Sequence, residues 1–580
     1  MAERRAGPPL PAPGAERGVA LITVLLALMA LMALSAAALA YGVGSQNLSR
    51  RDQDWNAALA AAEAGIDDYL FRLNENSNYF QYSAAYPPPD GNGAFAGYVP
   101  VPGGQGISRF RYQTDTSRLT VDGTITVTAT GRVRNVKRTV QATLRRRSFI
   151  DFLYYTDYET LDPALYTGPL FAGDTTYTPA QAEANCRRHQ YPPSSTRPSG
   201  CVEINFITAD VVNGPLHSND SILVCGAPRF NGDTSTSWNR PPPRYRTNSG
   251  CNPNNPVFAV PGDPRYLAPL AMPPSNAAIK AETLPGRGGC LFTGPTRITL
   301  NSNGTMTVQS PFSQQVHGGC VIGGTGPLPG NGVIYVQGVP ADPDDPNHTP
   351  GCPHTNPAHP LPALIVADDA TSYGCRAGDA FVEGTLAGQL TIAAENNVVI
   401  TGDLTYQGGV GGTSLLGLVA NNFVEIRHPV RVHTTTYNPP QTGQPAACSS
   451  TAPAPGGWER THWVTNSQGR YVQRICSRNP APVPTNRTVF AAILSVNHSF
   501  RVQQWNRGAA LGTLTVHGAI AQRFRGPVGT TSGGTVQTGY AKQYIYDQRL
   551  RYLSPPKFLD PVAAAWQVAT WREIRVPAGH

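Results

Sequence analysis

An uncharged stretch near the N-terminus, from Val19 to Ser49, constrains the fold of this chain more than any other feature. Its apolar core, Val19 to Tyr41, is long enough to cross a bilayer as one helix, which takes about 20 residues. Positively charged residues stand on both sides of it: Arg4, Arg5, Arg17, Arg50 and Arg51. We therefore expect one membrane-spanning helix close to the N-terminus.

Two junctions near this stretch are suited to proteolytic processing. A secretory signal has basic residues, a shorter apolar run and a small-residue cleavage site behind that run. The triplet Ala38-Leu39-Ala40 offers such a site, although the apolar run is long for a secretory signal. The second junction, Gly18-Val19, lies in front of the run. Cleavage there would remove the basic leader and leave the helix attached to everything downstream.

The sequence RGVALITVLLALMALMAL resembles the N-terminus of type IV pilins and pseudopilins, in which a basic leader and a glycine precede an apolar helix. The following run Ala61-Ala62-Glu63-Ala64-Gly65 is similar to a segment of minor pilus-assembly proteins of the PilX type. The resemblance is strongest over about the first 75 residues, with a looser match at 131–152. It implies cleavage between Gly18 and Val19 by a prepilin peptidase, methylation of the new amine, and other pilin subunits and an assembly platform as partners.

One position departs from the pattern of major pilins. In those proteins the fifth residue after the cut is usually a glutamate, and here, counting from Val19, it is Thr23. A carboxylate in an apolar helix is costly unless it is paired, so the glutamate implies packing inside a filament. Thr23 therefore favours a minor or tip subunit over a major pilin.

The helix is expected to continue past the membrane. Apolar residues recur at three- and four-residue steps, which predicts one buried stripe: Trp55, Ala58, Leu59, Ala62, Ile66, Tyr69, Leu70 and Leu73. The predicted helix runs from Val19 to about Asn74, on the order of 80 Å at 1.5 Å per residue. Gly42 and Gly44 each lower helix propensity by about 1 kcal/mol, which favours a flexible point near the membrane exit.

Changes in residue composition and hydrophobic pattern divide the chain into five predicted segments. Alternating strands at 109–113, 124–130 and 138–145 predict a small antiparallel region. Short β runs separated by Gly, Asn, Asp and Pro follow it. The segments are a prepilin-type leader at 1–18, a transmembrane and pilin-like helix at 19–75, the small antiparallel region at 76–159, a β-rich extracytoplasmic domain at 160–539 and a C-terminal cap at 540–580, with a helical patch at 561–569.

A recurrent apolar-x-Gly-x-apolar pattern suggests how the long β region folds. Two copies, Val382–Leu386 and Ile400–Leu404, start 18 residues apart, close to one turn of a β-solenoid. Each turn of such a coil buries its inward side chains by stacking on the next turn. The predicted fold is therefore mainly β with one long N-terminal helix: a pilin-like helix with a small antiparallel sheet, then a right-handed parallel β-helix. The alternative for the long region is a β-sandwich.

All ten cysteines lie beyond the membrane segment. An even number in an exported region suggests disulfides in an oxidising compartment. No two stand at CxxC spacing, which argues against zinc. The hypothesis is sequential pairing: Cys186 with Cys201, Cys225 with Cys251, Cys290 with Cys320, Cys352 with Cys375, and Cys448 with Cys476.

The search for reactive groups favours no enzyme. Catalytic motifs of nucleophilic hydrolases, zinc proteases and nucleotide-binding proteins are absent from the sequence. The best candidate for a glycan-active site is His217-Ser218-Asn219-Asp220, with Asp210 and Asp233 nearby. Asn and Asp commonly serve the turns of β folds, so a structural role is the stronger expectation.

Two charged segments could in principle bind a ligand, but each lacks features that such a site requires. Asp342, Asp344 and Asp345 offer oxygen ligands suited to calcium but lack the glycine and glutamate of an EF-hand, so we expect an acidic turn and no cofactor. The basic hairpin at 132–147 has no interleaved aromatic residues, which argues against a nucleic-acid partner.

These observations together predict a structural or assembly component of a type IV pilus-like system, a minor or tip pilin. Surface glycans are a further candidate partner. It would sit in the cytoplasmic membrane as a single-pass protein, with its C-terminal bulk outside for adhesion or for priming assembly. Two alternatives remain. One is a membrane-tethered enzyme or binding module acting on glycans, and the other is an uncleaved, signal-anchored envelope protein.

Overall fold

The structure is a computed structural model of the 580-residue chain. It describes residues 17–76, 79–103, 106–119, 124–146, 148–166, 177–190, 197–198, 200–316, 319–350, 374, 376–436, 460–465, 471–478, 485–532, 535–551, 553–559 and 566–575. The chain forms two compact units: unit 1 comprises 1–146 and 565–580, and unit 2 comprises 147–564. Unit 2 is thus an insertion into unit 1, and each unit is considered by itself.

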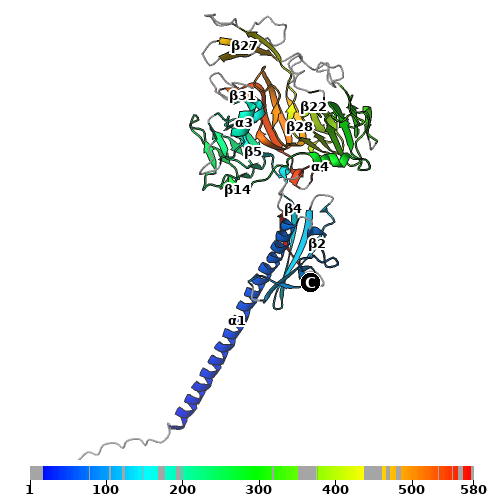
Figure 1. Ribbon diagram of the computed structural model, residues 1–580. Coiled ribbons are helices and arrows are strands. Elements are labelled where there is room, and N and C mark those ends of the chain that lie inside the picture. The colour runs from blue at the N-terminus through cyan, green and yellow to red at the C-terminus, as the bar shows by residue number, and fades with distance from the viewer. Residues whose placement is uncertain are drawn as a thin grey trace, which may run out of the picture. The chain divides into compact units, whose positions relative to one another are not determined.

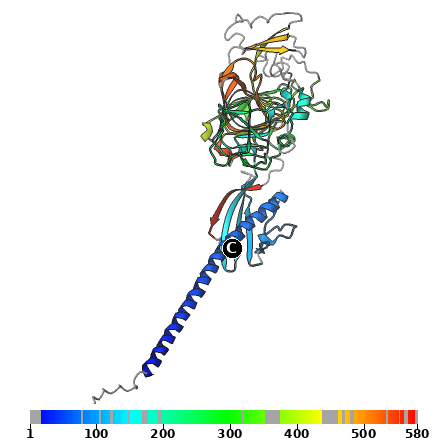
Figure 2. The same ribbon diagram turned by 90° about the vertical axis from the view of Figure 1, so that its left-hand side faces the viewer.

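In the residues that the structure describes, the elements of unit 1 are a long helix, a small antiparallel sheet and short 3-10 helices. In chain order its elements are α1 (Arg17–Glu75), η1 (Tyr79–Gln81), η2 (Gly93–Phe95), β1 (Val99–Pro100), β2 (Ser108–Asp115), β3 (Thr124–Val133), β4 (Val136–Arg146) and β33 (Trp566–Ile574). The strands lie in the order β1-β2-β3-β4-β33, and every neighbouring pair is antiparallel (Figure 2). The predicted helix and the three predicted strands are all present.

Helix α1 is continuous over 59 residues, without a break at Gly42 and Gly44 (Figure 1); flexibility at these glycines stays a prediction. Alanine and leucine, which have high helix propensity, dominate the turns before the two glycines and help to offset them. The C-terminal part of the helix packs on the sheet through buried apolar side chains: Ala58, Ala62, Ile66, Tyr69 and Leu73. These residues belong to the predicted stripe.

The last strand, β33, corrects the predicted C-terminal cap. Residues 566–574 pair with β4 in unit 1 and form no helix, and Tyr540 to Tyr546 belong to a strand of unit 2. The segment contains aromatic and β-branched side chains, which suit a half-buried strand. Trp566 is buried in the core between helix and sheet, and the Asn74 side chain donates to its carbonyl at 3.3 Å and accepts from its N–H at 2.6 Å.

Gly131 in β3 lies where the sheet comes closest to α1. A Cβ atom there would overlap the carbonyl oxygen of Ala58 and the amide nitrogen of Ala62. We expect Gly131→Ala to destabilise unit 1 by about 1–3 kcal/mol, because neither the helix backbone nor the strand can move aside freely. Amide hydrogen exchange in β2, β3 and β4 would measure this as a loss of protection of about fivefold or more. Gly97→Ala is the control, since no atom lies within 4 Å of a Cβ there; equal protection in both variants would contradict the expectation.

Unit 2 is built mainly of short strands. Its helices are η3 (Phe149–Asp151), η4 (Pro163–Leu165), α3 (Pro179–Cys186), α4 (Ala277–Lys280), η5 (Ala281–Thr283), η6 (Gly409–Gly411) and η7 (Gln548–Arg551). Its strands up to residue 337 are β5 (Tyr154–Leu161), β6 (Phe206–Ile207), β7 (Val211–Asn213), β8 (Leu216–Ser218), β9 (Ile222–Cys225), β10 (Arg229–Phe230), β11 (Thr234–Thr236), β12 (Tyr245–Thr247), β13 (Val257–Phe258), β14 (Arg265–Tyr266), β15 (Cys290–Thr293), β16 (Thr296–Leu300), β17 (Thr305–Gln309), β18 (Gly323–Pro327) and β19 (Val333–Gln337). The later strands are β20 (Ala380–Leu386), β21 (Gln389–Ala394), β22 (Val398–Tyr406), β23 (Leu415–Ala420), β24 (Val424–Ile426), β25 (Arg431–Thr436), β26 (Arg460–Thr465), β27 (Tyr471–Arg478), β28 (Arg487–Ser495), β29 (Phe500–Val502), β30 (Ala510–Arg525), β31 (Gly529–Ser532) and β32 (Thr535–Tyr546).

Most strands of unit 2 pair in parallel with a strand of the next turn. One parallel row runs β15-β19-β21-β23-β28-β30, and a second runs β16-β20-β22-β24-β29. Val382 pairs with Ile400, so the two copies of the glycine pattern lie on adjacent turns. Antiparallel strands extend this sheet at β17–β18 and β31–β32, whereas β25, β27 and β26 form a separate antiparallel sheet. The apolar side chains of successive turns form one continuous core.

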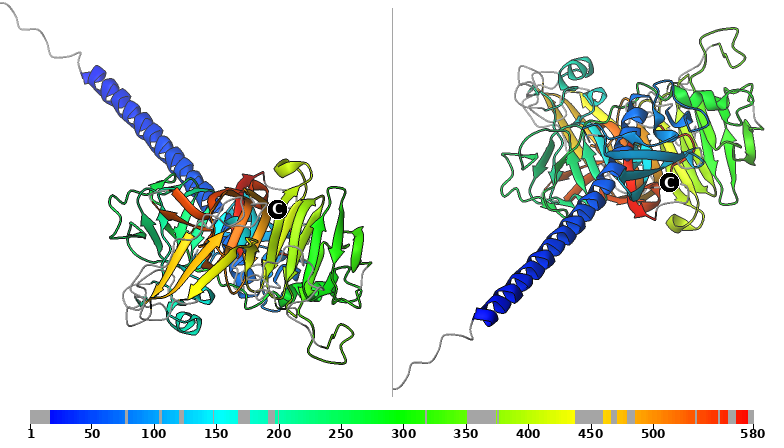
Figure 3. Two further views of the ribbon diagram at one scale, coloured as in Figure 1. Left: turned by 90° about the horizontal axis from the view of Figure 1, so that it is seen from above. Right: turned by 90° about the horizontal axis from the view of Figure 1, so that it is seen from below.

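The rows do not follow the order of the chain. Beyond β30 they continue through β32, β7, β10 and β13 on one side and through β5, β8, β11 and β14 on the other. Figure 3 shows the result: strands from the start of unit 2 lie beside strands from its end, and the middle of the chain lies farther along. The predicted boundaries at 159 and 539 are therefore wrong, because β5 and β32 both belong to the middle of the stack.

A crossover connects the two ends of the stack. From β14 the chain runs along the turns through α4 to β15. The carbonyl of Leu270 accepts from the Tyr155 hydroxyl at 2.7 Å, and the Asn276 side chain donates to the carbonyl of Ala394 at 2.7 Å. The return is needed because the first long strand, β5, and the last, β32, both pair with β30 in the middle of the stack.

Candidate functional site

The first candidate site is the N-terminal part of helix α1. Its large apolar side chains are exposed in unit 1: Leu21, Ile22, Val24, Leu25, Leu26, Leu28, Met29, Leu31, Met32, Leu34, Leu39, Tyr41, Val43 and Leu48. Among the residues that the structure describes, this is the one helix long and apolar enough to cross a membrane. Exposure of so many apolar residues is unfavourable in water, so this surface requires a bilayer or the apolar face of another helix.

The residues predicted to matter for processing lie on this helix. Gly18 and Val19 fall in its first turn, Thr23 is exposed one turn later, and Tyr41 is 82% exposed. The stretch has no charged side chain until Arg50. The geometry thus offers an uninterrupted apolar cylinder, which suits insertion, whereas cleavage and methylation stay predictions.

Arginines of the basic hairpin of unit 1 contact aromatic rings and a carboxylate within the same unit. The Arg132 guanidinium lies over the Tyr98 ring, with 4.5 Å to the centroid, and that of Arg138 lies over the Trp55 ring at 4.8 Å. Arg138 also forms a charge-assisted contact with Glu573 at 2.5 Å. These arginines therefore help join helix, hairpin and β33 within unit 1.

The second candidate is the predicted glycan-active cluster in unit 2. His217 is fully buried, with Nδ1 3.0 Å from the Ser235 hydroxyl and Nε2 3.1 Å from the Asn219 side-chain oxygen. Asp220 is also buried, where it pairs with Arg197. The structure thus brings His217 and Asn219 together, but their burial gives a polysaccharide no access to them.

The two nearby aspartates lie in different surroundings. Asp233 is on the surface and pairs with Arg265 at 3.2 Å. Asp210 is buried and contacts the Lys542 ammonium at 3.2 Å and the Arg525 guanidinium at 3.8 Å. Burial raises the pKa of Asp210, but the two cations outweigh burial and hold that pKa below its usual value. The six predicted residues therefore do not form one site.

Asp210 belongs to a buried charge cluster that the sequence analysis missed. Arg525 is enclosed and contacts Glu159 at 3.1 Å, donates to the carbonyl of Ile204 at 3.0 Å, and lies 3.7 Å from the centroid of the Phe206 ring. Glu159 is 1% exposed. The residues of this charge cluster come from positions as far apart as 159 and 525, so no local spacing in the sequence could have indicated it.

The predicted calcium residues form a turn. Asp342 accepts from the N–H of Asp344 at 3.0 Å, and Asp345 accepts from the N–H of Asn347 at 2.8 Å. In the part of the chain that the structure describes, no group of three or more His, Cys, Asp or Glu side chains is arranged to hold a metal ion. The absence of a cofactor stays a prediction.

Three disulfides link Cys186 to Cys201, Cys225 to Cys251 and Cys290 to Cys320. They are the first three of the predicted sequential pairs. Cys352, Cys375 and Cys448 lie outside the described residues, and so does the side chain of Cys476. Each observed bridge closes a loop of unit 2 that is rich in Pro, Asn or Gly.

Comparison with known proteins adds little to these observations. No family model matches the chain, and no curated protein matches it. Among solved structures, the chain is similar to the competence-associated pilin ComZ from Thermus thermophilus, with 12% identity and a TM-score of 0.27 over 90% of this chain and 97% of that one. At this level of similarity we draw no conclusion from it, and the proposals that follow rest on the residues of this chain.

Proposed function

We propose that this protein is a membrane-anchored structural component of a type IV pilus-like system, a minor or tip pilin of the PilX type. The observation that supports the proposal best is helix α1, whose first half is apolar and exposed and whose second half packs on a small antiparallel sheet. A helix of this kind inserts in a bilayer before assembly and can exchange lipid for neighbouring helices in a filament.

Processing and orientation follow from the flanking residues. A prepilin peptidase cuts after Gly18, and the amine of Val19 is methylated. The basic leader stays in the cytoplasm, in keeping with the positive-inside rule, and unit 2 lies outside the cytoplasmic membrane, where disulfides form. Thr23 places no carboxylate in the apolar helix, which suits a subunit that has no neighbour ahead of it.

Unit 2 is the part that the system displays. Its parallel rows support a right-handed parallel β-helix over a β-sandwich, because sandwiches are antiparallel. We infer a non-enzymatic role in adhesion or in priming assembly, with pilin subunits and the assembly platform as partners. The burial of His217 and Asp220 supports this role over a glycan-active enzyme.

The mass of the N-terminal peptide, taken from the protein in its native membrane, tests the proposal. A start at Val19 with an added methyl group supports the pilus pathway. An intact leader would contradict it and indicate an uncleaved, anchored envelope protein. A start at Tyr41 would contradict it too and indicate a secreted protein.

A charge in the middle of the apolar stretch tests the anchor separately. Leu28 is 47% exposed and makes no part of the core of unit 1. We expect Leu28→Arg to weaken insertion by about 2.5–3.5 kcal/mol, the cost of a central arginine in a spanning helix. The measurement is the fraction of protein that stays in membranes after alkaline extraction, with Leu28→Phe as the control. Equal retention of both variants would show that this stretch is not the anchor.

A further inference from the structure

Unit 2 contains a cleft of about 380 Å³ that none of the functions above uses. One wall is the segment around β6 and the other is the segment around β31, and Trp505 and β32 complete it. Its lining residues include Glu203, Ile204, Asn205, Asp210, Trp505 and Lys542. Pockets for small ligands measure roughly 300–1,000 Å³, so the cleft suits a ligand of one or two rings.

An acid–base pair lies in the cleft. Lys542 is about a third exposed, and Asp210 at 3.2 Å is its one ion-pair partner among the described residues. The second carboxylate oxygen of Asp210 accepts from the N–H of Ile207 at 3.0 Å. The ammonium therefore keeps N–H donors for a ligand, beside a fixed carboxylate acceptor. Such a pair can bind two neighbouring hydroxyl groups, one as acceptor and one as donor.

The charges of the cleft balance. Asp210 faces Lys542, Glu203 is paired with Arg246, and Arg197 pairs with both Glu203, at 2.5 Å, and Asp220. A strongly anionic or cationic ligand would find no opposite net charge here. The balance favours a neutral ligand.

The walls also disfavour an extended peptide. A peptide that adds to a sheet edge needs unpaired backbone groups along that edge. The N–H of Ile207 already donates to Asp210, and the N–H of Thr530 donates to the Thr538 hydroxyl at 3.2 Å. The half-buried indole of Trp505 and the side chain of Asn205 instead offer an apolar face and amide donors.

We propose that this cleft binds a short neutral saccharide of one or two sugar rings. The C–H face of a ring packs on Trp505 and the apolar wall, and ring hydroxyls contact Lys542, Asp210 and Asn205. The biological meaning rests on the proposed display of unit 2 outside the cell. Binding itself does not need the anchor, so the two proposals fail separately: loss of binding leaves the N-terminal processing untouched.

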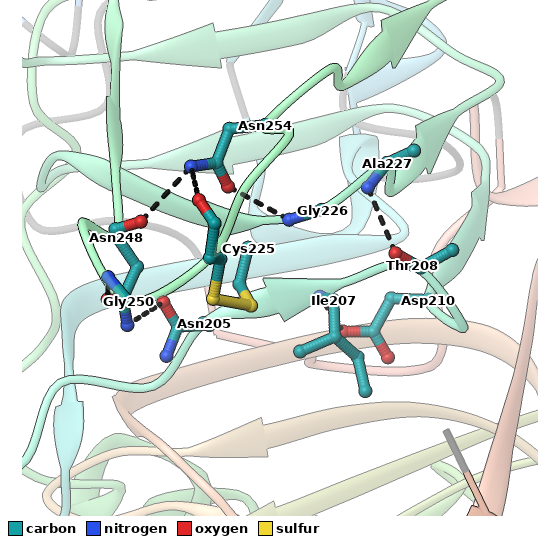
Figure 4. The surroundings of a disulfide bond; sticks show 11 residues. Asn205, Ile207, Thr208, Asp210, Cys225, Gly226, Ala227, Asn248, Gly250 and Asn254 are labelled. Atoms are coloured by element: carbon teal, nitrogen blue, oxygen red, sulfur yellow. Dashed lines mark hydrogen bonds between the residues drawn. A yellow bond between two sulfur atoms is a disulfide. The ribbon is translucent and has the colours of Figure 1, made fainter. Parts of the chain in front are cut away.

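A disulfide supports one wall of the cleft, which keeps it ready for a ligand. Cys225 of β9 pairs with Ile207 of β6 and is bridged to Cys251 (Figure 4). Beside it, Thr208 accepts from the N–H of Ala227 at 3.0 Å. A wall that is ordered before binding loses less entropy on binding. We therefore expect reduction of the disulfides to weaken saccharide binding.

The test uses the full chain in a detergent without a sugar headgroup. The probes are lactose, maltose and N,N′-diacetylchitobiose, with galacturonate and inorganic phosphate as anionic probes, and saturation-transfer NMR followed by calorimetry as readouts. We expect saturable binding of at least one of the three disaccharides and no saturable binding of either anionic probe. Saturable binding of an anionic probe alone, or of none of the five, overturns the proposal.

Three variants connect the binding to the cleft. Ala209 lines the cleft and is exposed, so Ala209→Trp obstructs it without removing a core contact. We expect Ala209→Trp and Trp505→Ala to weaken binding by about tenfold or more. Ala278→Trp places the same side chain on an exposed residue of α4 and should bind as the parent does. Binding that survives both cleft variants overturns the proposal, even if the parent binds a disaccharide.

Discussion

Arg525→Met is expected to destabilise unit 2 by about 3–5 kcal/mol. The guanidinium is 3% exposed and contacts Glu159 at 3.1 Å and Asp210 at 3.8 Å. Removing it leaves Glu159, which is 1% exposed, as a buried carboxylate without its cation. Asp210 suffers less, because Lys542 remains beside it. The effect comes from the unpaired charge and not from the loss of a strong attraction.

Chemical denaturation of the full chain, followed by fluorescence, would measure the shift at neutral pH. Arg187→Met is the matched control: its partner Glu183 is 45% exposed, and exposed ion pairs contribute less than about 1 kcal/mol. The double variant Arg525→Met, Glu159→Leu should regain much of the lost stability, because it removes both members of the pair. A shift in Arg525→Met no larger than in the control would refute this account of the cluster.

Asp379→Asn is expected to remove a pH dependence of several kcal/mol from unit 2. Asp379 is fully buried; one carboxylate oxygen accepts from Asn396 at 2.7 Å and from the N–H of Asn397 at 3.0 Å. The other oxygen has no hydrogen-bond partner among the described residues. Burial, with a smaller contribution from Glu425, raises the pKa of Asp379 from 3.8 to about 7.

The sign of the effect follows from the raised pKa. The folded chain holds the proton of Asp379 more tightly than the unfolded chain does. Its contribution to stability is therefore fully present below about pH 4 and is lost as the pH rises through 7. The loss is on the order of 4 kcal/mol, at about 1.4 kcal/mol for each pKa unit. Asparagine keeps both accepted hydrogen bonds and carries no charge at any pH.

Unfolding midpoints at several pH values between 4 and 8 would test this expectation. The parent protein should lose stability across this range relative to Asp379→Asn, so the two curves should converge at low pH. Asp403→Asn is the control, since that side chain is 57% exposed and the substitution should leave the pH profile unchanged. Parallel curves for the parent and Asp379→Asn would show that Asp379 is ionised in the folded protein without cost.

Sequence reasoning succeeded where the determinants are local. The apolar run and the alanine-rich stripe predicted helix α1 to within two residues at its start and one at its end. Alternation predicted β2, β3 and β4, and nearest-neighbour pairing matched three disulfides. These features depend on residues that are close in the chain.

It failed where distant segments decide the structure. Tyr154 of β5 pairs with Ile520 of β30, which no local pattern encodes, and so the order of the turns was not foreseen. Residues 566–569 belong to the expected helical patch at 561–569, but pairing with β4 overrides local propensity there. The cleft was not predicted for the same reason, because two of its residues, Lys542 and Asp210, are 332 residues apart in the chain.

The position of β33 has a consequence for how the protein is made. Asn74 and Trp566, which bond to each other, are 492 residues apart, and all of unit 2 lies between them. During synthesis the helix and the first four strands of unit 1 therefore exist for a long time with the edge of β4 open. An open strand edge invites pairing with other chains. Completion of the small sheet is thus a late step: a chain that stops anywhere within the insertion keeps helix α1 but lacks the strand that closes this edge.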